Sequence, residues 1–323
     1  MGLFKHESTC SHKLTDLGGN GHREYDIDLR LLFPFMRLPS MRSLYTLTAY
    51  IFWPNWPKSP IDFAPLKHTS NITTLYYDES VLAPVNVISS LCMFKGLKSF
   101  RWTASQTCFA LSIDFIGVQK ALGAALLAHK DTLEELHVDI RHVDRTGEAR
   151  QRSSDDAILI GSLKSYTKLR RLTIDANSIC GHQNWRLPGL ALVDMLPPNL
   201  ESLTLFVKLS ILNTDGSKVV TFDNKVWVSS LSQLIQNAPP ALRKVSLQIT
   251  QDPPAWLGEG VEPDITFLRD VIEDIKRECA KAHIAFDHQM AVQVFIDGKR
   301  TAGYTDIPYF LGQIKGRNPG RDF

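Results

Sequence analysis

One short hydrophobic pattern recurs along the chain: an apolar residue, two further residues, a second apolar residue, one residue and a third apolar residue. The clearest copies span residues 133–138, 169–174 and 200–205. Looser copies begin at Met41, Ile72, Leu97 and Leu242, and a degenerate last copy includes Ile284 and Phe286. Because alternation of apolar with other residues is typical of a strand with one buried face, each copy predicts a short β-strand.

Segments in which apolar residues recur three and four positions apart lie between these copies, and this spacing predicts helices. The expected helices cover residues 26–38, as a cap before the first copy, and residues 115–131, 157–164, 226–235 and 265–282. A strand and a helix with one apolar stripe each cannot bury both stripes alone, but stacked copies can. We therefore predict an α/β fold. It is an irregular leucine-rich-repeat solenoid, or horseshoe, of about seven to eight repeats, with parallel strands on the concave face and helices on the convex face.

The ends of the repeat region divide the chain into three predicted parts. These are a disordered N-terminal tail over residues 1–24, the solenoid over residues 25–288, and a C-terminal hairpin and tail over residues 289–323. The dipeptide Asp297-Gly298 follows an alternating apolar run, which is the signature of a hairpin turn.

Three segments interrupt the repeats. Residues 213–224 contain Asp215-Gly216 and predict a β-turn excursion. The charged segment Arg141–Asp156 is expected to be a solvated connection. Alternatively it is a regulatory loop, because Ser153 follows arginines and a phosphate there would add charge at a helix start. A Pro-rich loop carries Trp53 and Trp56, either as an exposed aromatic lip or as a cap on the core.

The phrases at Tyr166–Ile174 and Leu196–Leu205 resemble the irregular repeats of fungal F-box/leucine-rich-repeat proteins. One copy also has Asn177, which matches the family's asparagine that bonds backbone groups between turns. The resemblance covers residues 25–290. It implies a protein-interaction solenoid of the kind that recognises substrates in F-box-type ubiquitin-ligase receptors.

The F-box itself was not found. In the family it is a helical segment that lies before the repeats, opens with a Leu-Pro-x-Glu-like phrase and docks a Skp1-type adaptor, but no such phrase precedes Tyr25. On this reading the F-box was lost or the sequence is incomplete at its start, and a Skp1-type adaptor is not an expected partner. The alternative is an incomplete or degenerate gene product without independent function.

Composition narrows the classes of function. The 323 residues contain 36 Lys+Arg against 34 Asp+Glu, a formal net charge of +2, and 44% are hydrophobic. This hydrophobic content excludes a wholly disordered chain, and the lack of a basic excess argues against nucleic-acid binding. No apolar run reaches the ~20 residues of a membrane helix. The five cysteines are odd in number and widely spaced, which favours reduced thiols in a cytoplasmic or nuclear protein.

Motifs for catalysis are sparse. The sequence has no nucleophile elbow, no phosphate-binding loop and no zinc-protease signature. His137 and Asp139 could face the same way on one strand, as a base and its orienting carboxylate, yet no serine or cysteine nucleophile is evident beside them. We expect no enzyme activity, no cofactor and no metal site. An enzyme that uses His137 and Asp139 is the alternative.

If the strands stack, the residues between the motif positions form columns on the concave face. Tyrosine and arginine are enriched at interface hot spots, and here they gather in the N-terminal half of the columns. We therefore predict that this face binds an unknown protein partner. The candidate contact residues are Tyr45, Tyr76, Asp78, Arg101, His137, Asp139, Arg171, Asp175, Phe206 and Lys244.

Overall fold

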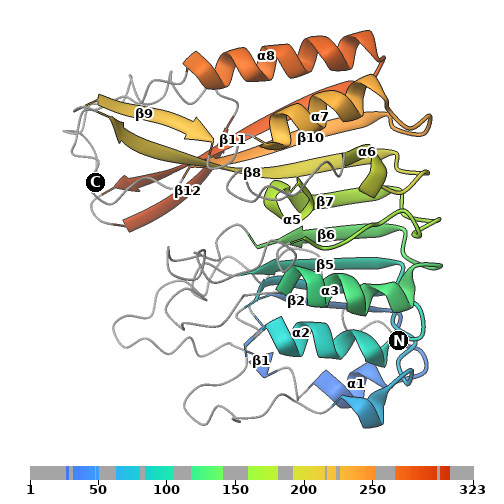
Figure 1. The fold of residues 1–323 in the computed structure, drawn as a ribbon. Helices are drawn as coiled ribbons and strands as arrows, with labels where there is room; N and C mark the ends of the chain where they lie inside the picture. The colour runs from blue at the N-terminus through green and yellow to red at the C-terminus, as the bar shows by residue number, and fades with distance from the viewer. Residues whose placement is uncertain are drawn as a thin grey trace.

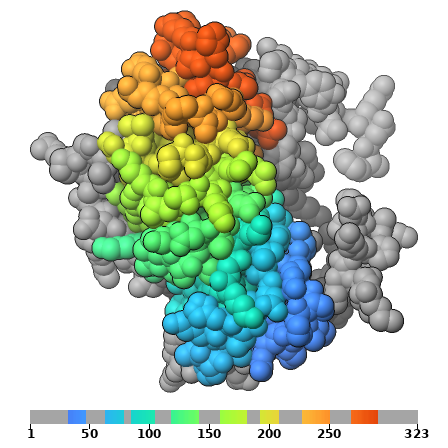
Figure 2. Space-filling view, turned by 90° about the vertical axis from the view of Figure 1, so that its right-hand side faces the viewer, coloured from blue at the N-terminus to red at the C-terminus, as the bar shows by residue number. Residues whose placement is uncertain are grey.

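The computed structural model describes residues 27–28, 32–47, 49–50, 63–80, 84–104, 118–140, 159–180, 192–214, 217–222, 226–251, 266–296 and 299–305. Within these residues the chain is an α/β protein whose main sheet contains eight parallel strands in sequence order, alternating with helices (Figure 1). The parallel strands are β2 (Ser43–Leu47), β4 (Thr74–Ser80), β5 (Ser99–Ala104), β6 (Glu135–Asp139), β7 (Arg171–Asp175), β8 (Ser202–Thr214), β10 (Lys244–Gln251) and β11 (Ala285–Ile296). Figure 2 shows the same order as coloured bands stacked from one end of the molecule to the other.

The predicted strands are confirmed, and their register follows the hydrophobic pattern. Strand β6 begins at Glu135, two residues after the start of its copy, and the other clear and loose copies keep this offset. Equivalent motif residues pair directly across the sheet, as Leu136 does with Phe100 on one side and Leu172 on the other. The degenerate last copy forms β11, in which Phe286 lies opposite Val245.

Backbone hydrogen bonds join the same point of each copy to the copy before it. The N–H groups of Glu134 and Glu135 both donate to the Lys98 carbonyl, at 2.7 and 2.9 Å. Arg170 and Arg171 donate in the same way to the Glu134 carbonyl. Because this junction recurs between neighbouring strands, the strands start level with one another, and their amino-terminal ends form one edge of the sheet.

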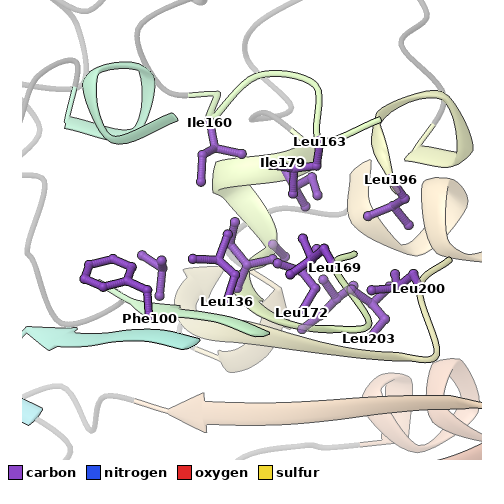
Figure 3. Packing of buried hydrophobic residues seen from close by; sticks show 14 of the residues in the cluster. Phe100, Leu136, Ile160, Leu163, Leu169, Leu172, Ile179, Leu196, Leu200 and Leu203 are labelled. Carbon is purple, nitrogen blue, oxygen red and sulfur yellow. The ribbon is translucent and has the colours of Figure 1, made fainter. Parts of the chain in front are cut away.

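The described helices lie on one face of the sheet (Figure 1). They are α1 (Phe33–Met36), α2 (Pro84–Ser90), α3 (Val118–Leu126), α5 (Ala176–Cys180), α6 (Leu192–Met195), α7 (Val226–Gln236) and α8 (Thr266–Lys281), with 3-10 turns η2 (Ala64–Leu66), η3 (Leu91–Met93) and η5 (Leu127–His129). Apolar side chains of the strands and of the connecting segments meet between the two layers, and Figure 3 shows Leu136 and Leu172 facing Ile160 and Ile179. None of the described helices combines the length and the apolar character needed to cross a bilayer.

Helices α3, α7 and α8 confirm the predicted helices at 115–131, 226–235 and 265–282 within their described parts. The predicted capping helix over residues 26–38 is wrong in extent, because Ile27–Asp28 is a strand and, of the described residues 32–38, Phe33–Met36 forms the α-helix. Pro34 stands at the start of this short helix, where its missing N–H costs nothing, rather than in a helix interior. Upstream, β1 (Ile27–Asp28) pairs in parallel with β3 (Ala49–Tyr50) as a separate two-stranded sheet.

The predicted helix at 157–164 is wrong over its described part, residues 159–164. Gly161 has a φ of +91°, a left-handed conformation that interrupts a helix. Ile160 instead donates its N–H to the carbonyl of Ser178 at 2.9 Å, so the apolar segment lies alongside α5. Its apolar residues Ile160 and Leu163 still reach the core, and a short helix, α5, follows β7.

Two antiparallel additions extend the sheet. Strand β9 (Ser217–Phe222) folds back on β8, which confirms the predicted excursion after residue 213. Strand β12 (Lys299–Thr305) folds back on β11, which confirms the predicted C-terminal hairpin. Strand β11 crosses the expected boundary between residues 288 and 289 without a break. The predictions for residues 1–24, Arg141–Asp156, Trp53 and Trp56 lie outside the described residues.

Candidate functional site

The residues between the apolar motif positions form aligned columns on the face of the sheet opposite the described helices. We call this surface the polar face. Cross-strand pairing places Tyr76 between Tyr45 and Arg101, and His137 between Arg101 and Thr173. The middle column therefore runs in the order expected from the sequence: Tyr45, Tyr76, Arg101, His137, Thr173, Thr204 and Ser246.

A pair of tyrosines occupies the first two strands of the polar face. The ring of Tyr45 is 62% exposed and meets the ring of Tyr76 edge to face, with centroids 4.8 Å apart and an interplanar angle of 87°. This is a favourable aromatic geometry, because the positive ring edge meets the negative ring face. The Tyr76 hydroxyl lies 3.0 Å from the Ser99 hydroxyl. Tyr76 therefore supports the exposed ring and is itself held by the next strand.

Hydrogen bonds continue this row across the sheet. The Ser99 hydroxyl donates to Glu135 Oε2 at 3.0 Å, and Arg171 Nη2 donates to the same oxygen at 3.1 Å. The hydrogen bond and the charge of Glu135 raise the pKa of the Arg171 guanidinium above its ordinary value. Strands β4 to β7 each contribute one member, so four copies of the repeat hold a single row of polar side chains.

An ion pair lies beside this row. Arg101 Nε is 2.6 Å from Asp78 Oδ1, and the hydroxyl of Thr103 donates to the same carboxylate oxygen at 3.3 Å. Both charged groups are partly exposed, so solvent screens the pair and its contribution to stability is small. The contacts instead orient the Arg101 guanidinium. Toward the other end of the sheet, Lys244 Nζ lies 3.6 Å from Asp287 Oδ2.

Three of the predicted contact residues are buried. Asp139, Asp175 and Phe206 are each at most 5% exposed. The Ser178 hydroxyl donates to Asp175 Oδ2 at 3.2 Å, and the Phe206 ring meets the ring of His137 with centroids 5.4 Å apart. Burial therefore removes these three side chains from the accessible surface of the polar face.

Two cysteines in the described part of the chain, Cys180 and Cys279, have thiols that are hard to ionise. Burial and the neighbouring Asp175 raise the pKa of the Cys180 thiol to about 12, and burial raises that of Cys279 to about 11. Thiols with raised pKa are poor nucleophiles at neutral pH. The described residues also contain no cluster of three or more side chains suited to a metal ion.

Apart from the three buried side chains, the candidate residues differ in where they lie on the polar face. Tyr45, Tyr76 and Arg101 lie together at the N-terminal end of the polar face, and Arg171 joins them through the hydrogen-bonded row. Lys244 lies apart from this group, on β10. Sequence reasoning missed Ser99, which links Tyr76 to Glu135, although its place between the apolar positions Leu97 and Phe100 was a usable signal.

Comparisons of the chain with protein-family models, with curated proteins and with solved structures find no match.

Proposed function

We propose that the chain is an irregular leucine-rich-repeat solenoid whose polar face binds a partner protein. The repeated Leu-x-x-Leu-x-Leu phrase and the stacking of eight parallel strands in sequence order support this assignment of the fold. Stacked repeats present one residue per copy at each position of the face, which produces an extended surface for recognition.

One observation carries the proposal: the row that starts at the exposed Tyr45 ring and runs through Tyr76, Ser99 and Glu135 to Arg171. Tyrosine and arginine are enriched among the residues that dominate the energy of many interfaces, and here they lie side by side on one face. Because neighbouring strands already hold these side chains in place, binding loses less conformational entropy than it would with free side chains. The favoured contact is therefore the N-terminal half of the polar face.

A photo-crosslinking amino acid at position 45 tests this proposal in cells of the source organism. The matched control places the same amino acid at Leu127, an exposed apolar residue of η5 on the helix-covered side. We expect crosslinks to a defined protein from position 45 and none to that protein from position 127. The double variant Tyr45→Ala, Arg101→Glu should abolish its recovery, whereas Leu127→Ala should leave recovery unchanged. Equal crosslinking from both positions contradicts the proposal.

We further propose, on the resemblance of the repeats to fungal F-box/leucine-rich-repeat proteins, that this surface recognises substrates for a ubiquitin ligase in the cytoplasm or nucleus. The expected partner is then a protein that accumulates when the polar face is altered. Its steady-state level should rise in cells with the Tyr45→Ala, Arg101→Glu variant, and its ubiquitylation should fall. If the partner binds but its ubiquitylation does not change in the variant, the ligase role is contradicted and only the protein-binding role remains.

A further inference from the structure

A hollow lies at the amino-terminal edge of the sheet, where the chain turns into β2, β4 and β5. Its volume is about 290 Å³. This volume lies at the lower end of the range for ligand pockets, so the hollow has room for a compact chemical group. Two of the lining side chains are cationic and none is acidic: the lining residues are Arg42, Asn71, Ile72, Thr73, Lys95 and Gly96.

Neutral acceptors hold both cations in place. The Lys95 ammonium donates to Asn71 Oδ1 at 2.8 Å. Asn71 Nδ2 donates to the carbonyl of Pro39 at 3.2 Å, and Arg42 Nη1 donates to the same carbonyl at 2.5 Å. The three side chains form one connected group, which brings two positive charges to the same hollow and neutralises neither.

Two other cations along this edge, Lys98 and Arg170, are paired with carboxylates. Lys98 Nζ lies 3.0 Å from Glu134 Oε1, and Arg170 Nη1 lies 3.1 Å from Glu201 Oε1. Lys98 has a carboxylate partner, whereas Lys95, only three residues away, has the neutral partner Asn71. Within the residues that the structure describes, neither Arg42 nor Lys95 has a carboxylate partner. Among the residues that the structure describes, the hollow therefore brings together two cations without a carboxylate partner, whereas Lys98 and Arg170 on the same edge each have one.

We propose that this hollow binds a compact oxyanion of the phosphoryl class, either free phosphate or a phosphate monoester. Arginine offers a planar fork of N–H donors and lysine a compact charge, and together they suit the several oxygens of a phosphate. Arg42 binds its backbone carbonyls through Nη1, which leaves Nε and Nη2 as donors for the anion. The site is separate from the polar face, so it does not depend on the proposed partner.

Titration of the full chain with inorganic phosphate at constant ionic strength tests this site, followed through the amide resonance of Gly96 and the side-chain amide of Asn71. We expect saturable shifts with phosphate and none with chloride. Lys95→Gln and Arg42→Gln should each weaken binding about tenfold, because each removes a charged hydrogen bond. Lys98→Gln, the matched control with a paired lysine, should bind phosphate as the wild type does.

A second arm uses O-phosphoserine in place of inorganic phosphate. Tighter binding of O-phosphoserine supports a phosphate monoester as the ligand, and tighter binding of inorganic phosphate supports the free ion. Shifts that do not saturate overturn the proposal. Equal weakening by Lys95→Gln and Lys98→Gln also overturns it, since that result indicates a general charge effect rather than a site. Because Lys95 is exposed, Lys95→Gln carries the test even if Arg42→Gln does not fold.

Discussion

The two faces of the sheet differ in how uniform they are from strand to strand. On the helix-covered face, the second residue of strands β4, β5, β6, β7, β8 and β10 is apolar and at most 1% exposed: Leu75, Phe100, Leu136, Leu172, Leu203 and Val245. The next residue of each strand points to the polar face, and there the chemistry changes at almost every step: Tyr76, Arg101, His137, Thr173, Thr204 and Ser246. Adjacent positions in the sequence thus obey different constraints.

The difference follows from packing. A side chain under the helices must fill a site of nearly constant shape in a close-packed interior, so each copy selects similar residues. A side chain on the polar face meets neighbouring strands and solvent, and many residue types satisfy that setting. Variation on this face is therefore available for recognition, while the opposite face keeps the strands stacked.

We expect the largest difference in stability between two neighbouring substitutions in β7, one on each face of the sheet. Leu172→Ala should lower the free energy of unfolding by about 2–5 kcal/mol, because it leaves a cavity at a buried site. Thr173→Ala, one residue away, should change it by less than about 0.5 kcal/mol. Urea denaturation of both variants measures the difference, and equal losses would contradict the assignment of the two faces.

Close packing between repeats on the helix side is tested at Gly123 in α3. A Cβ atom at this position would lie 1.8 Å from the carbonyl oxygen of Ile160, which is a backbone atom that cannot simply rotate away. Gly123→Ala should therefore destabilise the protein by about 1–3 kcal/mol through overpacking, despite the better helix propensity of alanine. Thermal unfolding with Ala124→Ser, an exposed neighbour, serves as the control. A more stable Gly123→Ala variant would show that α3 does not contact the segment that contains Ile160.

His129 is a polar exception within the helix-covered layer, and it predicts a pH dependence. The ring is buried: Nε2 donates to the Leu91 carbonyl at 3.1 Å, and Nδ1 accepts the N–H of Leu97 at 3.4 Å. This arrangement requires a neutral ring, and burial lowers the pKa of His129 below its ordinary 6.5, although the Leu91 hydrogen bond opposes the shift. The nearby His68 also lowers it.

As the pH falls below about 6.5, the unfolded chain therefore takes up this proton before the folded chain does. The contribution to stability is complete above that pH and is lost as the pH falls toward the folded pKa, by at most about 1.4 kcal/mol per pH unit. Urea midpoints between pH 7 and pH 5 measure this slope. His129→Gln should make it shallower, and an unchanged slope in that variant would contradict the prediction.

The smallest expected effect belongs to the polar face. Arg171 and Glu135 form a partly exposed pair, so a double-mutant cycle with alanine should give a coupling energy of about 0–1 kcal/mol that weakens in high salt. A coupling above about 2 kcal/mol would show that the row is important for folding and would weaken the case that it is held ready for a partner.

Prediction from sequence succeeded where the signal is local. The alternation in Leu169–Ile174 is sufficient to predict a strand, and its repetition is sufficient to align Leu136, Leu172 and Leu203. It failed for residues 159–164, where the apolar spacing is helical but Gly161 takes a positive φ and Ile160 bonds to Ser178. The conformation of residues 159–164 depends on their contact with Ser178, which follows β7 in the chain. The spacing of apolar residues within 159–164 carries no information about that contact.

The candidate site follows the same division. Alternation and repetition correctly aligned Tyr45, Tyr76 and Arg101 on one face. They did not distinguish the exposed Tyr45 from the buried Asp139 on the same face, because exposure depends on what covers each position in the folded chain.

The sequence by itself determined the order of the parallel strands, their register and the face that is buried, because each copy of the pattern encodes a strand locally and equivalent copies stack. Only the tertiary structure decided which side chains meet. The bonds from Tyr76 to Ser99, from Ser99 to Glu135 and from Arg171 to Glu135 join residues 23, 36 and 36 positions apart. The connections between copies differ in length and course, so these contacts and the cationic hollow at Arg42 and Lys95 exist only once the repeats are stacked.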